Sequence, residues 1–360
     1  MDELFPTLFI SNQLSQVQKP DLRLSSVPMS VDMVGVTEPE PAPISDVGTP
    51  VAIIQRSPRQ IAWRRLKRNK VSLISGGVAL FFILLAFGAP LFTKIFGVNN
   101  TTIYANTIGA GGLPLGPWGG VSWHHPFGVE PGVGRDLFGL LVYGSRISFS
   151  IAIITSVVFV ALGLFLGISA GLIGGTYDNV AGRISDFFLA FPVTFMVVAL
   201  SLPLTLRIES MGIAQNNGAR VIVLVLVLVL FSWPGFFRVV RSQVLSIREK
   251  EYILAARSLG ASNTRIIFKE ILPNLWPLAI IYLSISLPGY LAAEAIYSFL
   301  GVGVQAPGST WGLVLNDASN YWQRDPAYLA IPAGMVIIVV LALNLFGDGV
   351  RDALDTRGDR

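Results

Sequence analysis

Hydrophobic positions along this chain come in six long runs, each close to the roughly 20 residues that a helix needs to cross a bilayer. Five of the runs carry no charged residue, and the fifth in order contains a single acid, Glu294. The pattern predicts an all-α, polytopic membrane protein with six transmembrane helices. The runs are Val71–Thr93, part of Ile147–Tyr177, Phe187–Leu206, Val221–Phe237, part of Ile271–Gly303 and Pro326–Gly347.

Composition agrees with a membrane protein and excludes several kinds of chemistry. Only 13% of the 360 residues are charged, against about a quarter in a typical soluble domain, and 52% are hydrophobic. The chain has no cysteine, so it has no disulfide and no Cys-ligated metal. It has no Gly-Lys dipeptide, so a phosphate-binding loop with its lysine is missing. We therefore expect no catalytic residues, no metal site and no cofactor bound by this chain.

The two histidines, His124 and His125, are adjacent, so they point to different sides of an extended loop. A metal site would need further ligands at suitable spacing, and none is visible. We expect both to be ordinary loop residues.

The N-terminal part divides into two segments. Residues 1–55 are rich in proline and small polar residues, which predicts a disordered tail. Residues 56–70 hold seven basic residues and no acid. They are expected to form either an interfacial amphipathic helix on anionic lipid or a positive flank that only orients the first span. Nucleic-acid binding is not expected, because the adjoining span explains the charge.

Basic residues in the connecting segments predict the orientation. With the N-terminus inside, the inner segments hold most of the lysines and arginines, and both termini are expected to be cytoplasmic. Residues 94–146 then form a long external loop, in which Trp118, Trp123, Phe127 and Phe138 suggest a packed cap. The outer segments hold only Lys94, Arg135, Arg146, Arg207, Arg220 and Arg324.

Two features within the spans are candidates for function. Gly163, Gly167, Gly171 and Gly175 recur every four residues, which predicts a glycine face for close helix packing, either within this subunit or around a pathway that changes shape. Glu294 is a carboxylate inside an apolar run, where ionisable groups are expensive. It is a candidate pathway residue, and a structural hydrogen bond within the bundle is the alternative.

Residues 251–273 are polar and rich in small residues, and they lie between two spans on the side predicted to be cytoplasmic. The small side chains around Gly260 let a partner approach the backbone closely. A docking helix for a separate cytoplasmic subunit is expected here, and an ordinary amphipathic connecting loop is the alternative.

This segment resembles the cytoplasmic loop of ABC importer permeases, whose pattern is Glu-Ala-Ala, three residues, Gly, nine residues, then Ile-x-Leu-Pro. Leu254 replaces the glutamate of the pattern, and Glu270 replaces its isoleucine. The matching residues are Ala255, Ala256, Gly260, Leu272 and Pro273.

Further motifs resemble the dipeptide and oligopeptide branch of that family, and the basic stretch before the first span resembles its C-type subunit. Glu130 is a departure from the family's usual Asp or Thr-Asp region. The resemblance covers about residues 56–360, in stretches 124–153, 251–262, 271–274, 294–303 and 347–357.

The resemblance implies a type I ABC importer permease fold over residues 71–360, with a cytoplasmic coupling loop at 238–273. It implies a cell-membrane permease subunit of an ATP-driven importer of di- and oligopeptides, forming half of the pathway. The implied partners are a homologous second permease subunit, two ATPase subunits that bind ATP and Mg²⁺, and an extracytoplasmic peptide-binding protein. The residues implied to couple to the ATPase are Tyr252, Ala255, Ala256, Arg257, Gly260 and Ala261.

Three other interpretations remain open from the sequence. A permease for nickel or another small solute would share the same motifs, because specificity resides largely in the binding protein. An ion-coupled secondary transporter or channel would need its own coupling residues, for which Glu294 is the single candidate. A scaffolding membrane protein would need neither the glycine face nor the buried acid.

Overall fold

The computed structural model describes residues 58–355, so the tail predicted for residues 1–55 lies outside the described part of the chain. Within 58–355 the secondary structure is helical, with three isolated β-bridges and no strand. The helices are α1 (Pro58–Arg68), α2 (Lys70–Phe87), α3 (Ala89–Phe96), α4 (Leu137–Ile173), α5 (Gly175–Leu189), α6 (Val193–Ser210), α7 (Asn217–Arg248), α8 (Glu251–Ser258), α9 (Asn263–Arg265), α10 (Leu272–Phe299), α11 (Trp311–Ala318) and α12 (Pro326–Leu354), with 3₁₀ turns η1 (Ala105–Thr107) and η2 (Pro117–Gly119) and a π turn η3 (Ile266–Ile271).

Six helical segments of the described chain are long and apolar enough to cross a membrane. They are α2, α4, α6, α7, the continuous stretch Asn263–Phe299 that ends in α10, and α12. Each one overlaps a predicted run, so the prediction of an all-α protein with six spans is confirmed.

Two of the predicted runs are interrupted by proline-linked breaks. In the first run, helix α2 ends at Gly88. Helix α3 follows with Pro90 in its first turn, where the missing proline N–H is tolerated. The third run is divided between α5 and α6 because Pro192 disfavours helical backbone at the residue before it. The third span is therefore α6, which starts six residues later than predicted.

Two helices extend beyond the apolar runs and correct the loop boundaries. Asp136 caps α4 by accepting a hydrogen bond from the amide of Gly139 at 2.6 Å, so the last ten residues of the expected loop 94–146 are helical. At the other end, α7 continues to Arg248, so the first part of the expected loop 238–273 is helical as well. An apolar run ends at the first charge, whereas a helix can continue past that charge to its cap.

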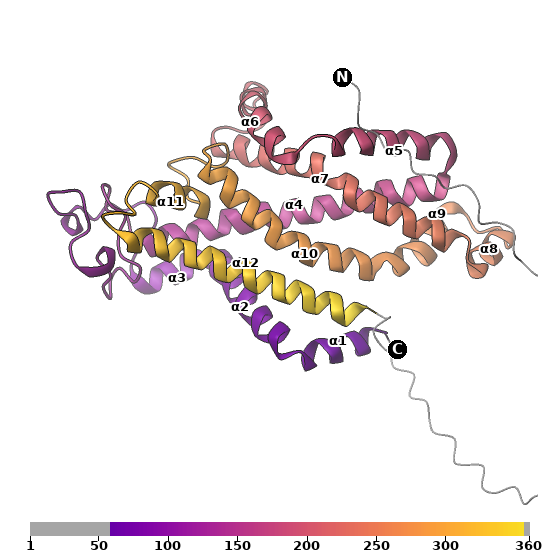
Figure 1. Cartoon of the computed structure of the whole chain (residues 1–360), viewed down its shortest axis with the longest axis horizontal. Coiled ribbons are helices and arrows are strands. Elements are labelled where there is room, and N and C mark those ends of the chain that lie inside the picture. The colour runs from indigo at the N-terminus through magenta and orange to yellow at the C-terminus, as the bar shows by residue number, and fades with distance from the viewer. Residues whose placement is uncertain (1–57, 356–360) are drawn as a thin grey trace, which may run out of the picture. The chain divides into compact units, whose positions relative to one another are not determined.

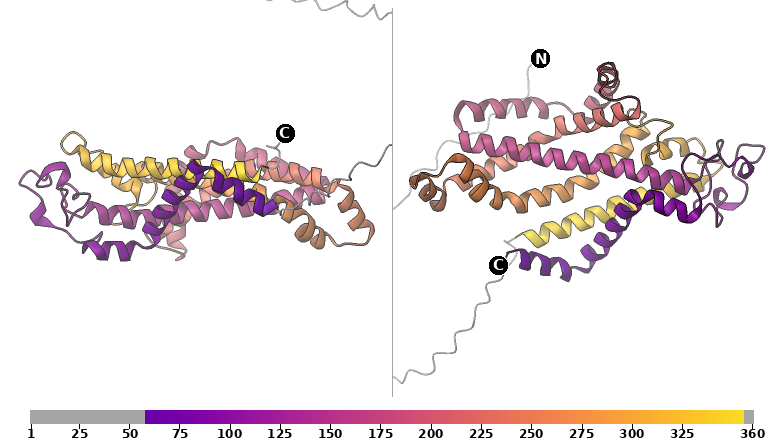
Figure 2. Two further views of the ribbon diagram at one scale, coloured as in Figure 1. Left: turned by 90° about the horizontal axis from the view of Figure 1, so that it is seen from below. Right: turned by 180° about the vertical axis from the view of Figure 1, so that it is seen from behind.

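Helices α4, α7 and α10 lie side by side and form the centre of the bundle, and α12, α2 and α1 follow on one side (Figures 1 and 2). Phe149 of α4, together with Leu228 and Phe236 of α7, is fully buried in this centre or nearly so. Helix α6 is seen nearly end-on in Figure 1, so it crosses the long helices steeply while it contacts α7.

Residues 97–136, which we call the cap, lie at one end of the bundle beside α11 and the start of α12 (Figure 1). The expectation that four aromatic residues pack together is half correct. Phe127 and Phe138 are in contact, with ring centroids 5.3 Å apart. Trp118 and Trp123 are 76% and 87% exposed, so they lie at the surface of the cap.

Candidate functional site

The segment 251–273 lies at the end of the bundle opposite the cap (Figure 1). Helix α8 ends in a Schellman motif: the amide of Gly260 donates to the carbonyl of Arg257 at 2.9 Å, and that of Ala261 donates to Ala256 at 3.0 Å. Gly260 occupies the left-handed position of this motif with φ +79°. The local fold thus explains the glycine without reference to a partner.

One face of the segment is anchored and the other is free. Ile253, Ile266 and Ile271 are fully buried against the bundle. The Tyr252 hydroxyl accepts a hydrogen bond from Asn274 at 3.3 Å. The opposite face exposes Ala255, Arg257 and Gly260, and Ala256 and Ala261 are partly exposed.

A Cβ atom added at Gly260 would have no heavy atom within 4 Å apart from those of its chain neighbours. Leu259 beside it is 89% exposed. The free face therefore combines small residues and exposed apolar side chains, which suits close approach by another protein.

Gly163, Gly167 and Gly171 line one face of α4 where α7 approaches. A Cβ atom at these positions would meet Phe236 at 2.5 Å, Val240 at 2.7 Å and Val244 at 2.8 Å. The three partners are also spaced by four residues, so each α7 side chain sits over one glycine. Gly175 lies beyond the end of α4, which corrects the predicted fourth member. The glycines are thus packed inside this subunit.

Glu294 of α10 is fully buried and lines none of the described cavities. Its Oε1 accepts a hydrogen bond from Ser298 Oγ at 2.8 Å, whereas Oε2 accepts none. Ser148 of α4 and Thr310, the N-cap of α11, lie nearby. This position joins three helices at the cap end of the bundle and fits a structural role.

Sequence reasoning missed two polar side-chain pairs in the cap. His125 is buried, and its Nδ1 lies 2.7 Å from Oδ2 of Asp136, whereas His124 is exposed. Burial raises the pKa of Asp136 above its usual value. Glu130 accepts two hydrogen bonds from Arg135, at 2.6 and 2.8 Å. The residue that departs from the family pattern is therefore paired within the cap. No group of three metal-ligating side chains occurs among residues 58–355.

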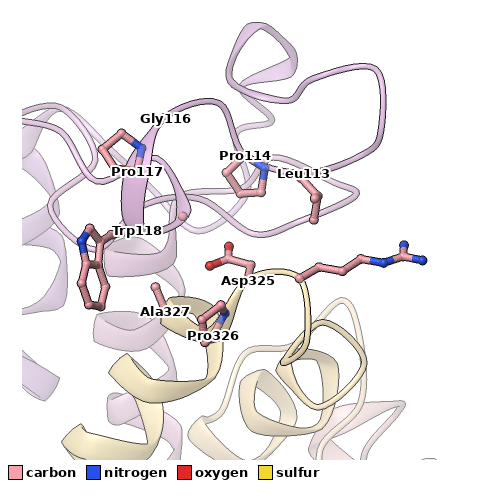
Figure 3. A pocket seen from close by; sticks show the side chains of 10 residues that line it. Leu113, Pro114, Gly116, Pro117, Trp118, Asp325, Pro326 and Ala327 are labelled. Carbon is pink, nitrogen blue, oxygen red and sulfur yellow. The ribbon is translucent and has the colours of Figure 1, made fainter.

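The cap meets the start of α12 at a cavity of about 330 Å³ (Figure 3). Pro117 and Trp118 lie on one side of the cavity and Leu113 and Pro114 on another, and the Asp325 carboxylate lies between them. Asp325 caps α12 through the amide of Tyr328 at 3.4 Å. The two sides of this cavity bring the cap against the start of the last helix.

Ion pairs also join α5 to the charged end of α7. Arg241 donates two hydrogen bonds to Asp178, one of them 2.6 Å long, and Arg238 pairs with Asp186. The hydrogen bond from Arg241 holds the pKa of Asp178 below its usual value. Arg248 donates to the carbonyl of Gly171 at 2.9 Å, near the end of α4. No sequence signal pairs these residues, because they are more than fifty positions apart.

Comparison with known proteins places these features in a family. Residues 163–359 match the model of the binding-protein-dependent transport system inner membrane component. Residues 57–106 match the N-terminal transmembrane domain of oligopeptide transport permease C.

Curated relatives match along most of their length. The dipeptide transport system permease protein DppC of Alkalihalophilus pseudofirmus is 35% identical over 89% of this chain and 95% of its own. The oligopeptide transport system permease protein OppC of Bacillus subtilis is 31% identical over 82% and 88%. A chain of the MetNI methionine ABC transporter, solved in an inward-facing conformation, aligns over 60% of this chain and 96% of its own, with 18% identity and a TM-score of 0.47.

The chain therefore belongs to the family of binding-protein-dependent inner membrane transport components, as a C-type permease subunit of the dipeptide and oligopeptide branch. It is a multi-pass integral membrane protein, and its family works with a separate ATPase and a substrate-binding protein. The chain is the permease subunit and not the enzyme of the complex.

Proposed function

We propose that this chain forms half of the translocation pathway of an ATP-driven importer of di- and oligopeptides. The proposed partners are a homologous second permease subunit, two ATPase subunits that bind ATP and Mg²⁺, and an extracytoplasmic peptide-binding protein. Names of relatives that carry dipeptides and oligopeptides support the cargo. Both termini are proposed to be cytoplasmic, because the basic residues gather on that side.

The observation that carries the coupling role is the free face of segment 251–273. It lies at the end of α7, is anchored by three buried isoleucines, and exposes small residues to a partner. We assign ATPase contact to this face. The residues assigned are Tyr252, Ala255, Ala256, Arg257, Gly260 and Ala261.

Substitution of Gly260 tests the assignment. A Gly260→Trp variant is expected to assemble and to lose about tenfold or more in peptide uptake, because the added Cβ has free space in its own chain and the indole extends into the partner's approach. It also strains a backbone with positive φ, so Gly260→Asn serves as the control, since asparagine tolerates this conformation. Uptake and ATP hydrolysis are measured on the reconstituted complex. Normal uptake by Gly260→Trp would contradict the coupling role.

A further inference from the structure

A cavity of about 540 Å³ opens at the cap end of the bundle. We call it the cap-side groove. Its walls come from the first half of α4, the start of α7 and the loop between α10 and α11. Its volume is within the range of small-molecule sites. The groove lies at the end of the molecule opposite the proposed ATPase contact, which is the end where cargo would enter.

Arg146 is the charged residue of this groove. It is the only charged side chain in the 37 residues of α4. It is exposed, and its guanidinium makes no ion pair or hydrogen bond with any residue in the described part of the chain. Arg146 directly precedes the apolar run that begins at Ile147, so its charge lies at the outer end of the span and faces the groove. An unpaired arginine that lines a cavity therefore points to an anionic ligand from outside this chain.

The groove is held open by hydrogen bonds that do not involve Arg146. Asn217 of α7 donates to the carbonyl of Gln305 at 2.7 Å and accepts from its amide at 2.9 Å. Ser309 Oγ donates to the carbonyl of Leu140 at 2.6 Å. The loop is thus fixed to α7 at one end and to α4 at the other. A preformed site loses less entropy when a ligand binds than a site that must first become ordered.

The lining indicates which anion fits. Arginine presents paired N–H donors that match a carboxylate. The rest of the lining is mostly aliphatic and amide, and it contains no acidic side chain. Ile147 and Val221 can receive an apolar side chain, and Tyr143 and Asn100 can hydrogen-bond to peptide groups. Such a lining suits a short peptide with a free C-terminus and disfavours a bare divalent cation.

We propose that the cap-side groove binds the terminal carboxylate of the peptide through Arg146 as the cargo enters the pathway. This inference rests on the proposed function and adds to it a substrate-contacting residue. Arg146 then prefers a peptide acid over the same peptide with an amidated C-terminus.

The test compares trialanine with trialanine amide in proteoliposomes that hold the full complex. The affinity of the binding protein for each peptide is measured separately, and uptake is measured with the binding protein saturated, so that its own selectivity is removed. Arg146→Gln is expected to slow uptake of the acid about tenfold or more and to leave uptake of the amide within twofold. For the peptide acid, the uptake rate of Arg146→Lys should lie between those of the wild type and Arg146→Gln. Arg207→Gln is the matched control, because Arg207 lies on α6 and does not line the groove.

A binding measurement covers the case in which the amide is not delivered. A photoreactive residue in place of Tyr143 is expected to crosslink radiolabelled trialanine in the assembled complex, and Arg146→Gln should abolish the crosslink. The inference fails if Arg146→Gln slows both peptides equally, if it changes neither, or if it leaves the crosslink intact. It also fails if native mass spectrometry shows that Arg146 holds an anionic lipid while uptake is unchanged. If the wild-type complex imports no peptide at all, the proposed function fails instead.

Discussion

At the scale of single residues, the contact between α4 and α7 depends on three glycines that leave room for α7 side chains. Gly167 is the central one, and Val240 occupies the space where its side chain would be. Both atoms that would collide belong to packed helices, so neither can move away cheaply. A side chain added at Gly167 would therefore push α4 and α7 apart.

Gly167→Leu is expected to destabilise the subunit by about 1–3 kcal/mol, the usual range for overpacking a core. Thermal unfolding of the purified protein in detergent measures the change. Gly77→Leu is the control, because Gly77 is exposed on α2 and a Cβ atom there meets nothing within 4 Å. Adding Val240→Ala should restore part of the loss in the Gly167 variant. An unchanged melting temperature for Gly167→Leu would show that α7 does not lie against this face.

At the scale of elements, two ion pairs hold α5 to α7, and they differ in how far their side chains are exposed to solvent. Asp178 is 12% exposed and Arg241 is 36% exposed, whereas Asp186 and Arg238 are 65% and 53% exposed. Exposed pairs contribute little, because water screens them. Most of the attachment should therefore come from Asp178, which receives two hydrogen bonds.

Asp178→Asn is expected to lower stability at pH 7 by about 1 kcal/mol, below the roughly 1.5–3 kcal/mol usual for hydrogen bonds to charged groups, because Arg241 is partly exposed. The folded-state pKa of Asp178 is lowered, so the contribution is complete above the ordinary aspartate pKa of about 3.9 and is lost as pH falls through the lower folded value. The difference in melting temperature between the variant and the wild type should thus shrink as pH falls below about 4. Asp186→Asn is the control, and its melting temperature should match that of the wild type both at pH 7 and below pH 4.

At the scale of the whole molecule, the cap and segment 251–273 lie at opposite ends of the bundle (Figure 1). The proposed orientation places the cap outside the cell and the segment inside. Because the chain has no cysteine, a single introduced cysteine reports its own side of the membrane without background.

Trp123→Cys in the cap and Leu259→Cys beside Gly260 are suitable reporters, since their side chains are 87% and 89% exposed. In intact cells a membrane-impermeant maleimide is expected to label the first and not the second. Permeabilised cells should give both labels. Labelling of Leu259→Cys from outside would reverse the orientation and with it the proposed ATPase contact.

Much of this organisation follows from local sequence pattern. Six spans appear as long apolar runs with at most one charged residue each, because hydrocarbon disfavours charge, and this effect depends on composition rather than on partners. The glycine spacing likewise marks the face of α4 that packs closely. Gly260 stands out in a small-residue segment, and the structure adds that it ends a helix in the left-handed conformation.

The boundaries and the polar pairs could not be read in the same way. The pattern ended the fourth span at Phe237, although α7 continues through Arg238 and Arg241, because it cannot show that α5 supplies Asp186 and Asp178. It left His125 as a loop residue for the same reason, since Asp136 approaches it only in the folded cap. Arg146 was one external cation among six until the groove around it was visible.

The chain by itself determined what each segment is compatible with: six apolar helices in lipid, and a polar segment rich in small residues between two of them. Those outcomes rest on transfer free energies and backbone preferences, which act residue by residue. Only the tertiary structure decided which charges are neutralised and which are left free, because that depends on distances between residues far apart in the chain. Asp178 meets Arg241 and His125 meets Asp136, while Arg146 faces an open groove with no partner in the described chain.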